Sequence, residues 1–170
     1  MSVFEPDYAP DPSLAGLPIG GLEYFAPSED GDLYILAMPI SKQIHNAIDA
    51  KHHNATVAIK DEDAERRLGR WGATDRNRVS LFGSLETIQG EKAIKAAETT
   101  FAKTHKDAIA YFPGKGPHQA YWAVFKVERI YWVGGFGDTH YIGWIPLELY
   151  KSVKLPKKSA WGLWRQGQIA

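Results

Sequence analysis

Three glycines and a histidine lie close together in YWVGGFGDTHY, residues 131–141, and glycine-rich turns of this kind can hold a phosphate group. A dinucleotide-binding loop needs the pattern G-x-G-x-x-G between a strand and a helix. Here Gly135 and Gly137 are followed by His140 where the third glycine belongs. The stretch PGKGPH lacks the first glycine and the final Ser or Thr of a Walker loop. Neither stretch predicts a nucleotide site, and the glycines indicate a sharp bend at a strand end.

Histidines and acidic residues could hold a metal ion if the fold brought them together. His45, Asp49 and His53 are spaced by four residues, which puts them on one face if a helix extends that far. The H-E-x-x-H pattern is missing and the chain has no cysteine, so a polar helix face is favoured over a metal site. A G-x-S-x-G elbow is missing too, so the sequence does not predict a serine hydrolase.

The composition is that of one globular domain. The chain has 170 residues, of which 44% are hydrophobic, 24% charged and 12% aromatic. The aromatic share favours a β-rich protein whose rings fill a barrel or a subunit interface. The formal net charge is zero, so no overall field attracts the protein to nucleic acid or an anionic membrane. We expect a single domain, residues 1–170, that binds neither nucleic acid nor a membrane.

Charge is distributed unevenly along the chain. No lysine or arginine precedes Lys42, and no acidic residue follows Glu148. The basic tail, residues 151–170, is either a solvated end or docks on the acidic N-terminal part, within one subunit or across a dimer. The first residues lack the basic and apolar regions of a signal peptide, and no segment has the length of a transmembrane helix. The sequence does not determine the cellular compartment, although the lack of a recognisable signal peptide favours the cytoplasm.

Hydrophobic periodicity and turn residues give the order of the elements. Residues 5–31 hold five of the ten prolines and are expected to form a long irregular loop. We predict helices from Ser41, from Gly90 and from Pro146. We predict strands over residues 2–4, 33–38, 55–59, 79–88, 119–133 and 141–144. The order repeats no βαβ unit, and it predicts a mainly β (α+β) fold, a small antiparallel Greek-key barrel with flanking helices.

Several stretches, in their order along the chain, resemble one protein family. The aromatic strand that ends in YWVGGFGD, followed by YIGWIPLELY, is similar to the C-terminal part of split-barrel flavoproteins. Upstream, LYILAMPISKQIHNAIDAKHHNATVAI, NRVSLFGSLETI and FAKTHKDAIAYF resemble earlier strands and helices of that family. The similarity covers residues 33–150. It is closest to the pyridoxamine 5'-phosphate oxidase-like and CREG-like proteins, a group that includes haem-utilisation proteins, and it implies an FMN-binding split barrel.

The resemblance implies a homodimer with FMN at the subunit interface. In the family, basic and hydroxyl groups meet the FMN phosphate, and Ser41 and Lys42 occupy the matching position at a helix start. A hydroxyl donor, a positive charge and free backbone N–H groups suit an oxyanion. Alternatively, Ser41 only caps the helix and Lys42 is solvated. The resemblance makes Trp132, Phe136 and Tyr141 the candidates for contact with the flavin ring.

Three functions remain open. The first is a flavin-binding oxidoreductase of unknown substrate, in which FMN does the electron chemistry. The second is a CREG-like homodimer that has lost flavin and catalysis, with residues 5–31 filling its pocket. The third is a haem-binding protein with His140 as the first candidate ligand. The stretch LYILAM lacks the basic phosphate-binding residue of the family. The substrate-binding Arg–His pair of the oxidases is not recognisable either. We therefore do not expect pyridoxamine phosphate oxidase activity.

Overall fold

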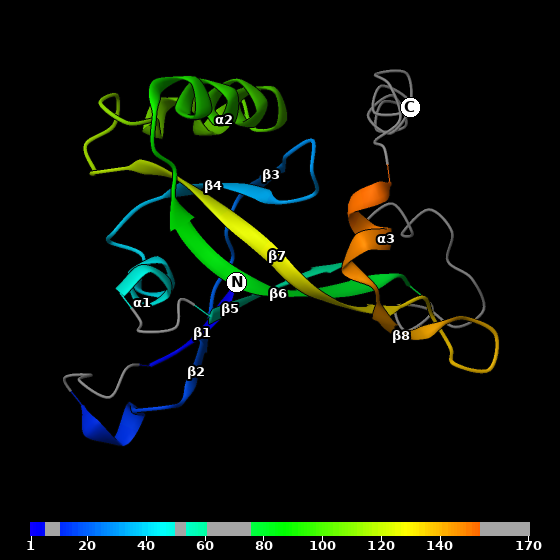
Figure 1. The fold of residues 1–170 in the computed structure, drawn as a ribbon. Coiled ribbons are helices and arrows are strands. Elements are labelled where there is room, and N and C mark those ends of the chain that lie inside the picture. The colour runs from blue at the N-terminus through cyan, green and yellow to red at the C-terminus, as the bar shows by residue number, and fades with distance from the viewer. Residues whose placement is uncertain (6–10, 50–53, 61–75, 154–170) are drawn as a thin grey trace, which may run out of the picture.

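The computed structural model describes residues 1–5, 11–49, 54–60 and 76–153. This part of the chain contains eight strands, three α-helices and two short 3₁₀ helices (η), and Figure 1 shows how the strands and α-helices are arranged. Their order is β1 (Ser2–Phe4), η1 (Pro12–Leu14), β2 (Pro18–Gly20), β3 (Phe25–Pro27), β4 (Leu33–Ala37), α1 (Lys42–Asp49), β5 (Asn54–Lys60), β6 (Arg78–Thr87), α2 (Glu91–Thr104), η4 (Asp107–Tyr111), β7 (Tyr121–Val133), β8 (Ile142–Ile145) and α3 (Leu147–Ser152).

All the described strands belong to one antiparallel sheet. Its order is β2-β1-β5-β6-β7-β4-β3, and β8 pairs with β7. The long strand β7 connects the two parts of the sheet, because its first residues pair with β4 and its last residues pair with β8. Within the described residues the path ends at β2 and β3, so the barrel is split rather than closed. The predicted α+β split-barrel class is therefore confirmed.

Two hydrophobic cores lie on the two faces of β4 and β7. The larger core includes Ile35, Phe125 and Val127, and α1 covers it with the fully buried Ile44 and Ala47. Burial of a valine, isoleucine or phenylalanine side chain in this core contributes about 1.5–3 kcal/mol.

The smaller core lies beneath α2. Its Phe101 and Trp122 rings meet edge to face, with centroids 5.2 Å apart. Trp122 is therefore buried although it lies on the opposite face of β7 from Phe125. Both faces of this part of the sheet are covered, which explains the dense run of apolar residues in the strand.

A β-bulge changes which residues of β7 face the core. Phe82 pairs with Arg129 and Gly83 pairs with Val127, so no residue of β6 lies opposite Glu128 in the backbone register. The inward face changes from odd-numbered residues such as Val127 to the even-numbered Ile130. Gly83 is required at this point, because a Cβ there would overlap the backbone carbonyl oxygen of Lys126.

Residues 5–31 are not one irregular loop, which corrects the prediction. The segment contains η1, β2 and β3, and the two strands pair with β1 and β4 at the edges of the sheet. Each has only three residues and carries a proline, which is tolerated at a sheet edge. Tertiary pairing rather than local propensity makes them strands. Residues 61–75, between β5 and β6, lie outside the described residues.

The other predicted elements are present, with ends that differ by one or two residues. The helix expected from Ser41 begins at Lys42, the one from Gly90 begins at Glu91, and the one from Pro146 begins at Leu147. The short helix η4 was not predicted. Lys151, the first residue of the basic tail, contacts Asp32 at 3.3 Å within the same subunit, and residues 154–170 lie outside the described part.

Candidate functional site

The start of α1 lies at the end of the buried strand β4. A turn closed by the Ser41 N–H and the Met38 carbonyl (2.9 Å) leads into the helix. The helix direction is fixed by Ile44 and Ala47, which point into the larger core. Ser41 precedes the first helical residue, and its carbonyl accepts the His45 N–H at 2.9 Å. The sequence therefore placed Ser41 and Lys42 correctly at a helix start.

Lys42 is paired with a buried carboxylate. Its Nζ lies 2.7 Å from Oε1 of Glu5, whose side chain is only 6% exposed. The Asn46 amide donates to the other oxygen, Glu5 Oε2, at 3.3 Å. The hydrogen bond from Lys42 is the main reason that the pKa of Glu5 lies below its usual value, and the bond from Asn46 adds to it. Lys42 is therefore engaged by an internal anion rather than only solvated.

Ser41 is engaged in the same way by a second carboxylate. Its Oγ donates to Glu23 Oε1 at 2.9 Å, and the Gln43 amide donates to the same oxygen at 2.9 Å. A Cβ at Gly21 would overlap the Gln43 amide, so the segment before β3 packs closely against α1. The Ser41 hydroxyl thus donates to a side chain of residues 5–31.

These contacts test whether the helix start fits the phosphate of FMN. Both side chains that would meet the phosphate already meet a carboxylate, Glu23 at Ser41 and Glu5 at Lys42. A phosphate group would have to displace both carboxylates or lie against their negative charge. In this conformation the residues do not fit the FMN phosphate.

The glycine-rich stretch forms the predicted sharp turn between β7 and β8. The Gly134 N–H donates to the Tyr141 carbonyl at 3.0 Å, and the His140 N–H donates to the Phe136 carbonyl at 2.7 Å. Gly135 has a φ of +133°, a conformation that favours glycine. His140 is exposed, and its Nδ1 lies 2.8 Å from the Thr139 hydroxyl. The turn presents His140 and Tyr141 at the surface.

The predicted cofactor residues fall into two separate groups within one subunit. Ser41 and Lys42 follow β4, which pairs with the beginning of β7, whereas Phe136, His140 and Tyr141 follow the end of β7. The 13 residues of β7 span roughly 40 Å when extended. Figure 1 shows α1 and β8 on opposite sides of the molecule. A single cofactor could meet both groups only if two subunits contributed to its site.

A pocket of about 660 Å³ lies beside the start of α1, where the segment before β3, the end of β4, α2 and η4 meet. The sequence does not indicate this pocket, because its walls come from segments that are distant along the chain. Tyr24 and Asp107, for example, are 83 residues apart and form a hydrogen bond of 2.9 Å. The lining residues are Leu22, Glu23, Tyr24, Leu36, Met38, Ile40, Phe101, Asp107, Ala108, Tyr111 and His118.

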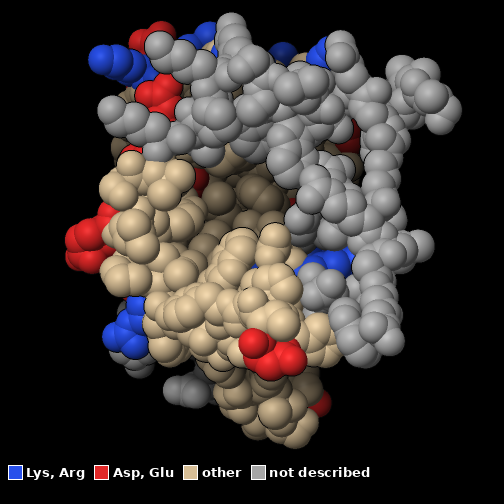
Figure 2. Space-filling model, turned by 90° about the vertical axis from the view of Figure 1, so that its right-hand side faces the viewer, with Lys and Arg blue, Asp and Glu red and all other residues tan. Residues whose placement is uncertain are grey.

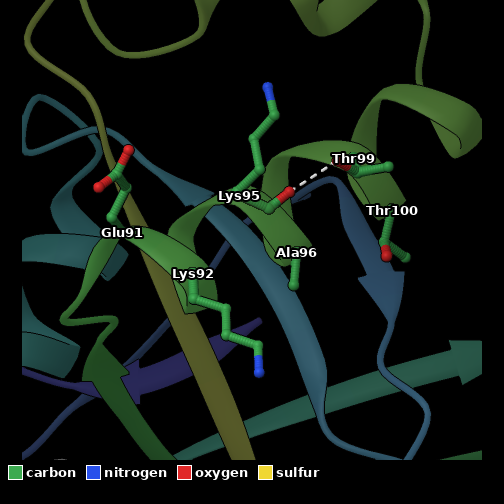
Figure 3. Close-up of a pocket in the computed structure, with 6 residues that line it drawn as sticks. All are labelled: Glu91, Lys92, Lys95, Ala96, Thr99 and Thr100. Carbon is green, nitrogen blue, oxygen red and sulfur yellow. Dashed lines mark hydrogen bonds between the residues drawn. The ribbon is translucent and has the colours of Figure 1, made fainter.

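A second hollow, of about 580 Å³, lies along α2 (Figure 3). Its described lining residues all come from this one helix, so no second element faces a ligand there. They are Glu91, Lys92, Lys95, Ala96, Thr99 and Thr100. Thr99 Oγ1 is turned back to the Lys95 carbonyl at 2.7 Å, as Figure 3 shows. This hollow is a helix surface rather than a binding site.

Exposed aromatic side chains gather on β6, β7 and β8. The Trp144 ring lies between Phe82 and Tyr131, with centroid distances of 5.6 and 5.2 Å. Trp144 is 55% exposed and Tyr141 is 57% exposed. Figure 2 shows this side of the molecule, and uncharged residues make up most of its described lower half. We call Phe82, Tyr131 and Trp144 the aromatic face.

The predicted preference for a polar face over a metal site at His45 stays a prediction. His53 lies outside the described residues, and no group of three metal-binding side chains occurs in the part of the chain that the structure describes. No helix in that part has the length and apolar character needed to span a membrane.

Comparison with known proteins agrees with the fold. One solved structure, a heme binding protein from Mycobacterium smegmatis, has a TM-score of 0.66 and 20% sequence identity; the match covers 82% of this chain and 51% of that one. A protein of unknown function from Agrobacterium tumefaciens has a TM-score of 0.57 and 13% identity, over 79% of this chain and 50% of that one. The chain therefore spans about half the length of each.

No curated protein sequence matches the chain significantly. The family model described as "CREG, beta-barrel" matches residues 11–152, which include every described element from η1 to α3. The chain therefore belongs to the CREG β-barrel family.

Proposed function

We propose that this protein is a CREG-like homodimeric binding protein whose FMN phosphate position is taken by its own carboxylates. The observation that carries the proposal is the pairing of Lys42 with Glu5 and of Ser41 with Glu23. A phosphate group carries about 1.5 to 2 negative charges at neutral pH, so it competes directly with these side chains. The proposed role is ligand binding without flavin redox chemistry.

The carboxylates are held in place and do not simply lie near the basic side chain. Both oxygens of Glu5 have partners, Lys42 on one and Asn46 on the other. Hydrogen bonds to a charged group are stronger than those between neutral groups. Displacing them would raise the free energy of an FMN complex, because a buried carboxylate without its cation is costly.

The proposed homodimer rests on the aromatic face. Monomeric proteins seldom expose a large contiguous apolar patch, and aromatic side chains are enriched in subunit interfaces. The aromatic face lies beside the glycine turn, at the opposite end of β7 from α1. A partner that covered it would bury Trp144, which is the largest ring of the patch.

FMN and haem remain the competing cofactors. FMN would need Ser41 and Lys42 of one subunit together with Trp132, Phe136 and Tyr141 of the other, after the two glutamates have moved away. Haem is suggested by the name of the Mycobacterium protein, and the exposed His140 is the candidate ligand here. Neither cofactor has a preformed site that joins these residues within the described subunit.

The visible absorption spectrum of the purified protein tests the proposal. We expect colourless protein that stays colourless after incubation with FMN or haemin and removal of the free cofactor by gel filtration. A stoichiometric yellow complex would contradict the proposal and support the flavin alternative. A red-brown complex that His140→Ala abolishes would support the haem alternative instead.

A further inference from the structure

The pocket between the segment before β3, β4 and η4 combines an apolar floor with polar walls. Leu36, Phe101 and Ala108 are buried at its base. Leu22, Tyr24, Ile40 and Tyr111 line it with exposed side chains. A volume of about 660 Å³ is within the usual range of roughly 300–1,000 Å³ for small-molecule sites.

The charged side chains that line this pocket are acidic. Glu23 and Asp107 both belong to the lining, and no lysine or arginine does among the described lining residues. His118 adds an imidazole at the wall. Two carboxylates without a lining cation create a negative potential in the hollow, and low-dielectric walls strengthen such a potential. The pocket therefore disfavours anions.

Asp107 is held in its ionised form by a neighbouring tyrosine. The Tyr24 hydroxyl donates to Asp107 Oδ2 at 2.9 Å, and this bond is the main cause of an Asp107 pKa below its usual value. The same bond raises the pKa of Tyr24, so the phenol keeps its proton. Tyr24 is itself stacked on His105, with ring centroids 4.6 Å apart. The carboxylate and the ring beside it are thus preorganised.

The tyrosine rings give the pocket a second feature that suits a cation. Tyr24 and Tyr111 both line it, and the faces of aromatic rings attract ammonium groups. The apolar floor at Leu36 and Phe101 would receive the uncharged part of the same molecule. A site with carboxylates, tyrosines and an apolar base has the chemistry of an amine-binding pocket.

We propose that this pocket binds an organic cation, an ammonium group carried on an aromatic or aliphatic body. The ammonium lies against Asp107 with the Tyr24 and Tyr111 rings beside it, and the apolar body lies on Leu36 and Phe101. The proposal goes beyond the proposed function, because that function names no ligand. Binding of FMN to the wild type would overturn the proposed function and leave the pocket's preference for cations unchanged.

Three small probes that share a phenyl ring and differ in charge test the proposal. Phenethylammonium, 2-phenylethanol and phenylacetate are titrated into the full-length protein, and backbone amide shifts are followed by NMR. We expect phenethylammonium to bind at least about fivefold more tightly than the alcohol, with shifts at Tyr24, Asp107 and Ala108. Phenylacetate should bind most weakly. Added salt should weaken the ammonium complex and leave the alcohol complex unchanged.

Asp107→Asn supplies the decisive variant, because the asparagine carbonyl can still accept the Tyr24 hydroxyl and keep the fold. The substitution should weaken the binding of phenethylammonium about fivefold or more and leave the affinity for 2-phenylethanol unchanged. Glu86→Gln removes an exposed carboxylate of β6 outside the pocket and should change neither affinity. Equal affinity for the three probes, shifts confined to another surface, or unchanged ammonium binding in Asp107→Asn would overturn the proposal.

Discussion

At the residue scale, the buried carboxylate of Asp32 connects the turn before β4 to two elements, β7 and α3. It accepts the Val127 N–H at 3.0 Å and contacts Nζ of Lys126 at 3.0 Å and of Lys151 at 3.3 Å, and its side chain is only 2% exposed. Asp32→Ala would leave the buried Val127 N–H without its acceptor and remove the partner of both lysines. We expect a loss of about 3 kcal/mol in the free energy of unfolding, measured by urea denaturation. Asp138→Ala, in the exposed turn, should change it by less than about 0.5 kcal/mol.

The pair between Glu5 and Lys42 makes stability depend on pH. Because the pKa of Glu5 is lowered from 4.5 in the folded protein, the unfolded chain takes up the proton first as the pH falls. The stabilisation is therefore present above about pH 4.5 and is lost as the pH falls through the lower folded value. In Lys42→Ala the loss of stability between about pH 6 and pH 3 should be smaller than in the wild type. Equal pH dependence in urea titrations of the two proteins would contradict the pairing.

The sequence could predict the position of Ser41 and Lys42 but not their partners. The helix start follows from local signals, namely Ser41 and the apolar spacing of Ile44 and Ala47. Glu23 lies 18 residues before Ser41, and Glu5 reaches Lys42 because β1, which directly precedes Glu5, packs against α1. No local rule gives such a contact, since it depends on the tertiary path of a proline-rich segment.

At the element scale, the bulge between β6 and β7 depends on Gly83. A Cβ there would overlap the backbone carbonyl of Lys126, which cannot move without disturbing the ladder. We expect Gly83→Ala to lower the free energy of unfolding by about 2 kcal/mol or more. Gly137→Ala is the matched control, because its Cβ would meet only the end of the Ile142 side chain. Chemical denaturation of both variants measures the difference, and an equal effect would argue against this close approach.

The elements with strong local patterns could be predicted, and the short ones could not. The helical spacing predicts a buried stripe of Ile94, Ala97 and Phe101 in α2. Ala97 and Phe101 are buried, whereas Ile94 is 36% exposed. The three-residue strands β2 and β3 have no periodicity of their own, because they exist through pairing with β1 and β4. The alternation of β7 fails after Val127, since a bulge shifts the inward face by one residue and leaves no clear mark in the sequence.

At the scale of the whole molecule, the aromatic face predicts self-association. Trp144 lies at the centre of this face between Phe82 and Tyr131. We expect the wild type to be a dimer in multi-angle light scattering and Trp144→Glu to be a folded monomer, because a charge in an apolar interface is costly. Ile94→Glu, at an exposed position on α2, should leave the dimer intact. A monomeric wild type at micromolar concentration would contradict the proposed interface.

The whole-molecule account depends on the competition between FMN and the chain's own carboxylates at the start of α1. The most direct test is a fluorescence titration of FMN into the wild type and into the double variant Glu5→Gln, Glu23→Gln. We expect no saturable binding to the wild type and measurable binding to the double variant, with riboflavin, which lacks the phosphate, showing no such difference. Glu29→Gln, an exposed change in the turn between β3 and β4, should behave as the wild type. The account would be contradicted if FMN bound tightly to the wild type and if Lys42→Ala weakened that binding about tenfold.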